Sequence, residues 1–312
     1  MARTFVRIAA GTACGLLATT ASATEGGGNS YPVGVETQMV GLMPPPGDHV
    51  FVYAQHYDAK HQKDSAGANN AALANFRLRA DIVAVRWSHV WRNLKLLGAQ
   101  VETRVVQPFA NVDLALGIAR PAPLGPLDRS GDHAGLADPA FVPFVLGWHG
   151  ESYHQAAGLD THLPWGDYDA ARRVNTGRNT WQVAPFYAFT WLPARGWEAS
   201  AKLRYAFNAR NRATDYRSGD EATVEYSAGY RFLPAFAAGV NGYVYRQVSD
   251  DLAAGAPAGG NGNRGRVQAL GPYVQYNVTP AVALLFKLQQ EWGARNRPQG
   301  TRAWLQLRIP FQ

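Results

Sequence analysis

Polar and apolar residues alternate along several stretches in the second half of the chain. In the segment 197–208, "WEASAKLRYAFN", one set of alternate positions runs from Trp197 to Phe207 and is apolar throughout, while the other set is mostly charged or polar. The same alternation recurs over residues 181–191 and 221–232. Successive side chains of a β-strand point to opposite faces, so each stretch is predicted to be a two-sided strand.

Other stretches alternate less regularly, four in the second half and five in the first half. With them the chain is predicted to contain about twelve strands, an even number. The predicted strands cover residues 49–57, 76–90, 100–112, 140–148, 153–163, 181–191, 197–208, 221–232, 236–248, 266–277, 281–292 and 301–311.

Alternation alone fits a soluble β-sandwich as well as a membrane barrel. The strand length of about 10 to 12 residues favours a barrel, because tilted membrane strands have this length and soluble strands average about 5 to 6 residues. The apolar faces of the three most regular strands also carry no charge and have aromatic residues at their ends. A charge facing lipid would cost about 2–4 kcal/mol at mid-depth.

The predicted connections alternate between short and long, as in outer-membrane barrels with short periplasmic turns and long outer loops. The short ones are residues 91–98, 147–152, 193–196, 233–235 and 278–281, and the long ones are 58–72, 116–138, 165–180, 209–220, 249–265 and 293–300. The fold class is therefore predicted to be all-β, a transmembrane antiparallel up-and-down β-barrel of about 12 strands. Both chain ends are expected at the periplasmic rim.

One long loop contains "GNGNRG", residues 260–265, which has the glycine spacing of a dinucleotide-binding fingerprint. That fingerprint requires a preceding strand and a following helix, whose N-terminus holds the pyrophosphate. Here a loop-like stretch precedes the glycines, and an alternating stretch with a proline follows them. The glycines are therefore interpreted as loop residues that permit positive φ angles.

The first 23 residues have the features of a secretory signal peptide. "MARTFVR" is basic, residues 8–20 are apolar, and "ASA" at 21–23 provides small residues for cleavage. The single cysteine, Cys14, lies in this segment, and Gly11 stands where a lipidation motif would have a bulky aliphatic residue. The mature chain is thus expected to have no thiol, no cysteine-based metal site and no transmembrane helix.

Residues 24–47 lie between the predicted signal peptide and the predicted barrel, residues 48–312. This segment has apolar residues at roughly helical spacing before "PPP": Val35, Met39, Val40, Leu42 and Met43. A short apolar helix with nothing outside to pack on is predicted to plug the barrel. The alternative is a loose periplasmic tail.

The net charge is +7, or +5 without Arg3 and Arg7 of the predicted signal peptide, and the basic residues are spread along the chain. This distribution argues against a nucleic-acid partner. It is compatible with outer-membrane lipid and lipopolysaccharide as partners, and equally with ordinary solubilising charge.

The polar faces of the predicted strands would line the lumen. One interpretation is that these side chains line a path and select solutes, and the alternative is that opposite charges pair across neighbouring strands and fill the barrel. Two inward tyrosines would suit an aromatic solute, because a ring can stack while its hydroxyl stays hydrated. The candidate lining residues are Glu198, Lys202, Arg204, Glu225, Arg231, Asn241, Tyr243, Tyr245, Lys287, Glu291, Arg302 and also Arg308.

Catalytic, metal and cofactor sites are not indicated. All eight histidines fall between His49 and His162, outside the most regular strands. His149 and His154 are five residues apart, which is not the HExxH spacing of zinc ligands on one helical face. An outer-membrane lipase or deacylase would need a nucleophile beside a histidine, so this class is a minor alternative. A receptor or structural barrel that acts through its long outer loops is the other alternative.

Several long segments resemble the outer-membrane family named for the meta-pathway of phenol degradation, which includes sphingosine-induced, SphA-like proteins. They include "LPWGDYDAARRVNTGRNTWQVAPFYAFTW", "TDYRSGDEATVEYSAGYRF", "GNRGRVQALGPYVQY" and "RNRPQGTRAWLQLRIPF", and the early "YPVGVETQMVGLMPPPGDHVFVY" extends the resemblance over nearly the whole mature chain. Gln312 departs from outer-membrane habit, since it follows Phe311 at the end. The resemblance implies an outer-membrane channel for passive uptake of small hydrophobic or aromatic compounds, without a cofactor.

Overall fold

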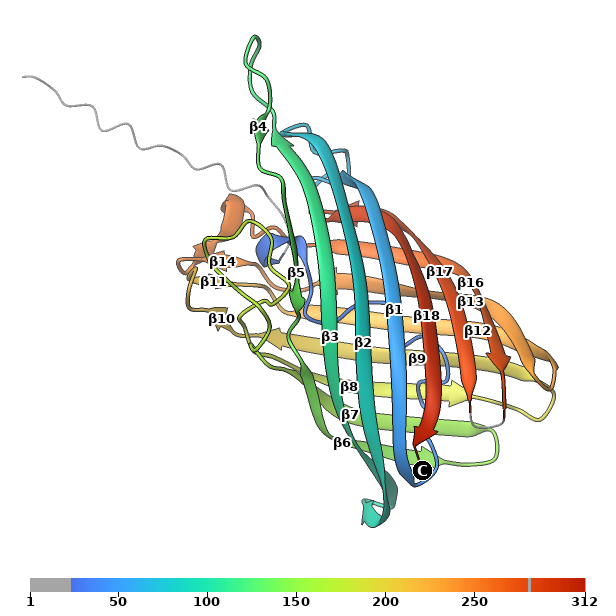
Figure 1. The fold of residues 1–312 in the computed structure, drawn as a ribbon. Coiled ribbons are helices and arrows are strands. Elements are labelled where there is room, and N and C mark those ends of the chain that lie inside the picture. Colours follow the sequence, from blue (N-terminus) through green and yellow to red (C-terminus); the bar gives the residue numbers. More distant parts are fainter. Residues whose placement is uncertain (1–23, 280–281, 312) are drawn as a thin grey trace, which may run out of the picture.

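The computed structural model describes residues 24–279 and 282–311. The predicted signal peptide, residues 1–23 with Cys14, and the terminal Gln312 lie outside the described residues. In the described chain, twelve antiparallel strands form one closed barrel (Figure 1), because β1 pairs with both β2 and β18 and β2 pairs with β3. The barrel strands are β1 (Gly47–Gln62), β2 (Leu73–Leu96), β3 (Ala99–Ile118), β6 (Ala140–His149), β7 (Tyr153–His162), β8 (Gln182–Trp191), β9 (Trp197–Asn208), β12 (Glu221–Leu233), β13 (Phe236–Gln247), β16 (Arg266–Asn277), β17 (Ala283–Arg295) and β18 (Pro298–Phe311).

The predicted all-β barrel and its strands are confirmed, and the alternation has the predicted sense. On β9 the apolar side chains face outward, with Leu203 52% and Phe207 50% exposed, whereas Lys202 and Arg204 point inward and are 1% and 4% exposed. The outer surface is thus apolar, and the charged side chains lie in the lumen. This sidedness suits a barrel with lipid outside.

Strands β1, β2 and β3 are longer than predicted, with 16, 24 and 20 residues. β2 continues through the predicted turn 91–98 as far as Leu96, and only Leu97 and Gly98 connect it to β3. Both connecting residues have positive φ, 51° and 77°, which allows a two-residue turn. At the other rim, β2 and β3 remain paired with each other beyond the end of β6.

The predicted long loop 293–300 is wrong. β17 runs to Arg295 and β18 starts at Pro298, which leaves Asn296 and Arg297 as a tight turn. Gly293 and Asn296 have positive φ, 64° and 51°, and these two residue types adopt such angles at low cost. The polar composition of this stretch therefore indicates a sharp turn and not an extended loop.

The other long loops contain short strands that were not predicted. β5 (Gly131–Leu136) pairs with β3, after β4 (Leu127–Asp128). The loops 209–220 and 248–265 together form a four-stranded sheet of β10 (Arg210–Asn211), β11 (Tyr216–Arg217), β14 (Leu252–Ala253) and β15 (Ala256–Pro257). The glycine-rich residues 260–265 lie in the second loop, after the single-turn helix η2 (Ala258–Gly260), as loop residues.

Residues 24–46 run through the lumen from the long-loop rim to the short-turn rim, and the predicted helix in this segment is wrong. Apart from the single turn η1 (Glu25–Gly27), the segment is irregular, because inward side chains of the barrel bond its backbone groups. Thr24 N donates to Asp251 in an outer loop, whereas Gly41 N donates to Thr190 near the short-turn end of β8. The first described residue therefore lies at the long-loop rim, and the expectation of both chain ends at the periplasmic rim is wrong (Figure 1).

The helices among residues 24–279 and 282–311 are single turns, none of them long and apolar enough to cross a bilayer.

Candidate functional site: the barrel lumen

Inward side chains from the strands anchor the backbone of residues 24–46, here called the luminal segment. The Glu225 carboxylate accepts hydrogen bonds from Tyr31 Oη at 2.6 Å and from the Gly34 amide. Lys287 Nζ donates to the Gly34 and Val35 carbonyls, each at 2.7 Å. Backbone groups that would lack partners in a dry lumen are thus satisfied, and the segment is fixed in one position.

A cluster of seven charged side chains surrounds the segment midway through the lumen. We call it the waist cluster; its members are Glu36, Arg86, Glu102, Arg104, Asp160, Lys202 and Arg204. Glu36 bonds Arg86 of β2 at 2.8 Å and lies 3.5 Å from Arg104 of β3, and its other oxygen contacts Lys202 of β9. One carboxylate of the luminal segment therefore bridges opposite walls of the barrel.

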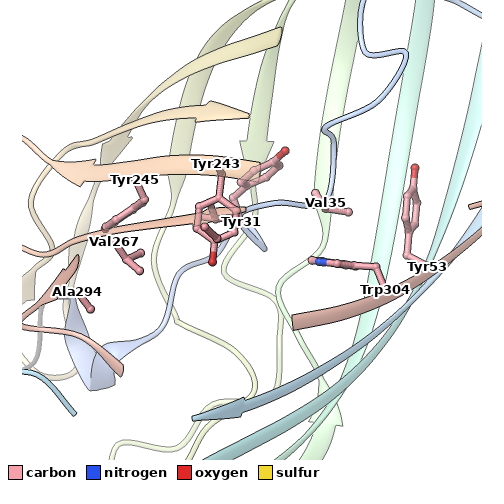
Figure 2. Packing of buried hydrophobic residues seen from close by; sticks show 10 residues of the cluster. Tyr31, Val35, Tyr53, Tyr243, Tyr245, Val267, Ala294 and Trp304 are labelled. Carbon is pink, nitrogen blue, oxygen red and sulfur yellow. The ribbon is translucent and has the colours of Figure 1, made fainter. Parts of the chain in front are cut away.

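Aromatic and aliphatic residues pack around the outer half of the luminal segment (Figure 2). Tyr31, Val33 and Val35 of the segment belong to one buried cluster with Tyr243 and Trp304 of the wall, among others. Trp304 Nε1 donates to Gln289 Oε1 at 2.9 Å, so its polar edge is satisfied inside the cluster. These side chains are buried, so the segment is held by apolar burial as well as by hydrogen bonds.

A second buried cluster lies toward the short-turn rim. Met43 packs there with Val142, Val145 and Phe186, and Val40 lies against the cluster. The two clusters are separated along the segment by Glu36 and its basic partners. The lumen is therefore filled in three layers, apolar, charged and apolar.

The long-loop end of the segment is held by the outer loops. Asp251 accepts hydrogen bonds from Thr24 N, Tyr216 Oη, the Gly219 amide and Gln247 Nε2. Burial raises the pKa of the Asp251 carboxyl despite these bonds, so its hydrogen-bond donors offset only part of the cost of burying the charge. Its many donors make Asp251 the point where the segment and both loops meet.

The predicted lining residues lie on the inward faces of their strands, and most bond the luminal segment or one another. Glu198 accepts from Gln38 of the segment at 2.6 Å and from Tyr273. Asn241 accepts from Gln289 at 2.7 Å.

Glu291, Tyr243 and Arg302 form one hydrogen-bonded group. The Arg297 guanidinium stacks 4.1 Å from the centre of the Tyr245 ring. Arg231 lies at the short-turn rim, beside a surface hollow of about 330 Å³, and Arg308 lies partly buried on β18.

The predicted plug residues are not equivalent. Val35 and Met43 are buried, 9% and 7% exposed, in the two apolar clusters. Val40 is partly buried, as are Met39 and Leu42, and the Met39 amide donates to Ser200 Oγ. The segment thus contacts the wall through alternate short stretches and not through one helical face.

Sequence reasoning missed Glu36, Arg86, Glu102, Arg104 and Asp160. The four wall residues lie in strands that were predicted, on the inward parity, and counting charges at that parity would have found them. Glu36 lies in the stretch that was predicted to form an apolar helix, so only its isolated charge among apolar neighbours could have marked it.

The histidines do not form a metal site. The rings of His149 and His154 face each other across a turn, with centroids 5.4 Å apart. In residues 24–279 and 282–311, no group of three or more His, Cys, Asp or Glu side chains could hold a metal ion.

The closed apolar-faced barrel, with short turns at one rim, long loops at the other and a charged lumen, defines a β-barrel of the outer-membrane type. The profile of the family described as "Putative MetA-pathway of phenol degradation" matches residues 60–307, and the chain belongs to this family. None of the curated protein sequences matches the chain.

Two solved structures show the same architecture. An outer membrane channel from Pseudomonas putida F1 superposes with a TM-score of 0.73 at 16% identity, covering 89% of this chain and 98% of that one. The beta domain of the Bordetella autotransporter BrkA gives a TM-score of 0.51 at 11% identity, covering 86% and 100%. At these identities the two structures show the fold alone, a barrel like that of the outer membrane channel.

Proposed function

We propose that this protein is an outer-membrane channel for passive uptake of small hydrophobic or aromatic compounds, and that the luminal segment closes it at rest. The observation that carries the proposal is a noncovalent plug in a continuous barrel. Residues 24–46 occupy the lumen from rim to rim, yet ion pairs and hydrogen bonds hold them, which an arriving solute could replace. Membership in a family described by phenol degradation supports an aromatic solute.

The test is reconstitution into vesicles with lipopolysaccharide in the outer leaflet, which slows the passage of apolar solutes through lipid. Transfer of an aromatic solute and of a sugar of similar mass is compared for the full chain and for a variant lacking residues 24–43. We expect the full chain to pass the aromatic solute faster than the sugar, and the shortened chain to pass both. Equal transfer of both by the full chain would indicate a general porin. No transfer by either protein would indicate a structural barrel.

A receptor that acts through its outer loops is the second candidate. The observation in its favour is the ordered sheet of β10, β11, β14 and β15, because long loops seldom build a sheet of their own. Removing residues 252–257, which contain β14 and β15 of this sheet, should leave transfer unchanged if the lumen conducts. Loss of transfer in this variant would favour the loops as the functional part.

A further inference from the structure

The inner surface of β2 and β3 differs from the rest of the lumen, because it is apolar between the long-loop rim and the waist cluster. Alternate residues of β2 and β3 point inward there and form laterally paired rows. These inward residues are Leu78, Ala80, Ile82 and Ala84 on β2 and Val106, Pro108, Ala110, Val112 and Leu114 on β3. We call this surface the apolar wall. At about 3.3 Å per residue, it extends over about 20 Å along β2, from Leu78 to Ala84, and about 26 Å along β3, from Val106 to Leu114.

The inward direction follows from the strand register. Tyr57 of β1 is paired with Ala80, and its hydroxyl reaches across the lumen to Glu291. On the opposite face of the same part of β2, Arg77 pairs with Asp58, and Asp81 with His56, at the outer surface. At the long-loop end of the apolar wall, charged side chains therefore lie outside and apolar ones inside. Further along β2 the outward residues Val83 and Val85 are apolar too, so both faces of the strand are apolar there.

The luminal segment covers only part of the apolar wall. Its hydrogen bonds to the barrel strands go mainly to side chains of β8, β9, β12, β17 and β18. It reaches β2 and β3 through Glu36, and Ala84 packs against the cluster around Val35. Leu78, Ile82, Val106 and Val112 remain partly exposed. A solute from the long-loop rim could thus follow the apolar wall as far as Arg86, which is paired with Val106.

The waist cluster at the inner end of the apolar wall favours an anion. It contains four basic side chains against Glu36, Glu102 and Asp160, so withdrawal of Glu36 leaves four positive charges facing two negative ones. Arg86 is 8% exposed, its Nε has no hydrogen-bond partner, and its guanidinium lies 3.7 Å from the centre of the Phe51 ring. Buried cations without partners are costly, so an incoming carboxylate would compensate for the loss of Glu36.

We propose that the channel takes hydrophobic carboxylates, whose apolar body lies on the apolar wall while the carboxylate replaces that of Glu36 on Arg86 and Arg104. Glu36 is a built-in substitute for the solute's charged group, and its side chain is 20% exposed, which leaves it accessible. Exchange of one carboxylate for the other releases the luminal segment. A neutral hydrocarbon could lie on the apolar wall but could not replace the Glu36 carboxylate. This inference rests on the proposed function and specifies its solute class and its opening step.

Accessibility of the luminal segment provides the test. Val40→Cys is introduced in a Cys14→Ser background, and its labelling by a membrane-impermeant thiol reagent is followed in proteoliposomes; Met39→Cys serves as a second reporter. We expect 4-phenylbutyrate to accelerate labelling by about fivefold or more, the lower end of typical coupling between two sites. Acetate lacks the apolar body and 4-phenylbutanol lacks the charge, so neither should accelerate it. Equal effects of all three compounds, or no effect of 4-phenylbutyrate, would overturn the proposal.

Matched variants distinguish the contribution of the apolar wall from that of the waist cluster. Ile82→Asn should abolish the response to 4-phenylbutyrate, whereas Asp81→Asn, on the outward face of the same strand, should keep it. Glu36→Gln should label rapidly without any compound and gain little from 4-phenylbutyrate. A full response in Ile82→Asn, or slow labelling of Glu36→Gln, would contradict the proposal. If aromatic transfer persists while labelling ignores 4-phenylbutyrate, this inference fails and the channel function stands; if transfer is absent, the channel function itself fails.

Discussion

Gly34 is where the luminal segment bends between two of its strongest anchors. Its φ is +92°, its amide donates to Glu225, and its carbonyl accepts from Lys287 and Gln289. A Cβ at this position would collide with Gln289 Oε1 and lie 2.8 Å from Tyr243 Cδ1. The conformation and the close packing both require glycine.

Gly34→Ala should therefore loosen the plug without unfolding the barrel. A residue forced into an unfavourable backbone region costs about 1–3 kcal/mol, and the segment can avoid this cost by leaving its site. We expect a higher ion conductance in planar bilayers than for the unmodified protein. Gly125→Ala is the control, because a Cβ there would meet nothing within 4 Å. Unchanged conductance of Gly34→Ala would show that the segment does not limit passage.

The sequence alone identifies which residues of the second half point inward, because charged and apolar residues alternate there. Lys202, Arg204 and Glu225 are placed by this parity. Their partners in the luminal segment, such as Glu36 for Lys202, could not be predicted, since the apolar spacing of that segment indicated a helix that does not form. The alternation fades on β2 and β3 for a physical reason: Ile82 and Val106 face inward and are as apolar as the residues that face lipid.

Among the elements, the two outer loops that share a sheet depend on one buried side chain. Asp251 accepts bonds from both loops and from the start of the luminal segment, whereas the adjacent Asp250 pairs with Arg264 at the surface. Removing Asp251 leaves several buried donors without an acceptor. Each such donor costs about 1–3 kcal/mol.

Asp251→Ala should consequently open both loops together. Trypsin cleavage after the exposed Arg212 and Arg264, one in each loop, is expected to accelerate by roughly tenfold or more, which corresponds to about 1.4 kcal/mol of local stability. Asp250→Ala should leave cleavage after Arg212 unchanged. Acceleration in only one of the two loops would show that they do not form one unit.

The elements differ in how well the sequence predicts them. Strands follow from alternation, but the helix expected around Met39 and Leu42 does not form. Gly34 and Gly41 both disfavour a helix. Inward side chains of the barrel strands supply the hydrogen bonds that a helix would make internally. The sheet of β10, β11, β14 and β15 rests on two-residue pairings between distant loops, which leave no local pattern.

At the scale of the whole molecule, stability depends on an uncharged outer surface. Leu203 lies in the middle of β9 and is 52% exposed, whereas Leu233 is equally exposed at the short-turn rim. Leu203→Arg should lower the free energy of unfolding from vesicles by about 2–4 kcal/mol, and Leu233→Arg by about 0–1 kcal/mol, because the cost depends on depth. Urea midpoints of folding into phospholipid vesicles measure both. Equal costs at the two positions would exclude lipid around β9.

The strand number, the closed sheet and the two kinds of rim could all be predicted from sequence. They follow from strand length, charge-free outer faces and alternating connections, which are local properties. The path of residues 24–46 is not local, because its anchors lie from 50 positions away, for Glu36 and Arg86, to more than two hundred, for Thr24 and Asp251. The position of the first described residue therefore emerges from the assembled lumen.

The position of Thr24 at the long-loop rim constrains how the molecule is assembled. The luminal segment precedes every barrel strand in the chain, and the strands that follow it enclose it. The segment is most simply enclosed before β1 and β18 pair. Pairing of these two strands would then close the barrel and place the segment in the lumen in the same step. A peptide fused ahead of Thr24 would then be displayed on the cell's exterior, opposite the carboxyl end.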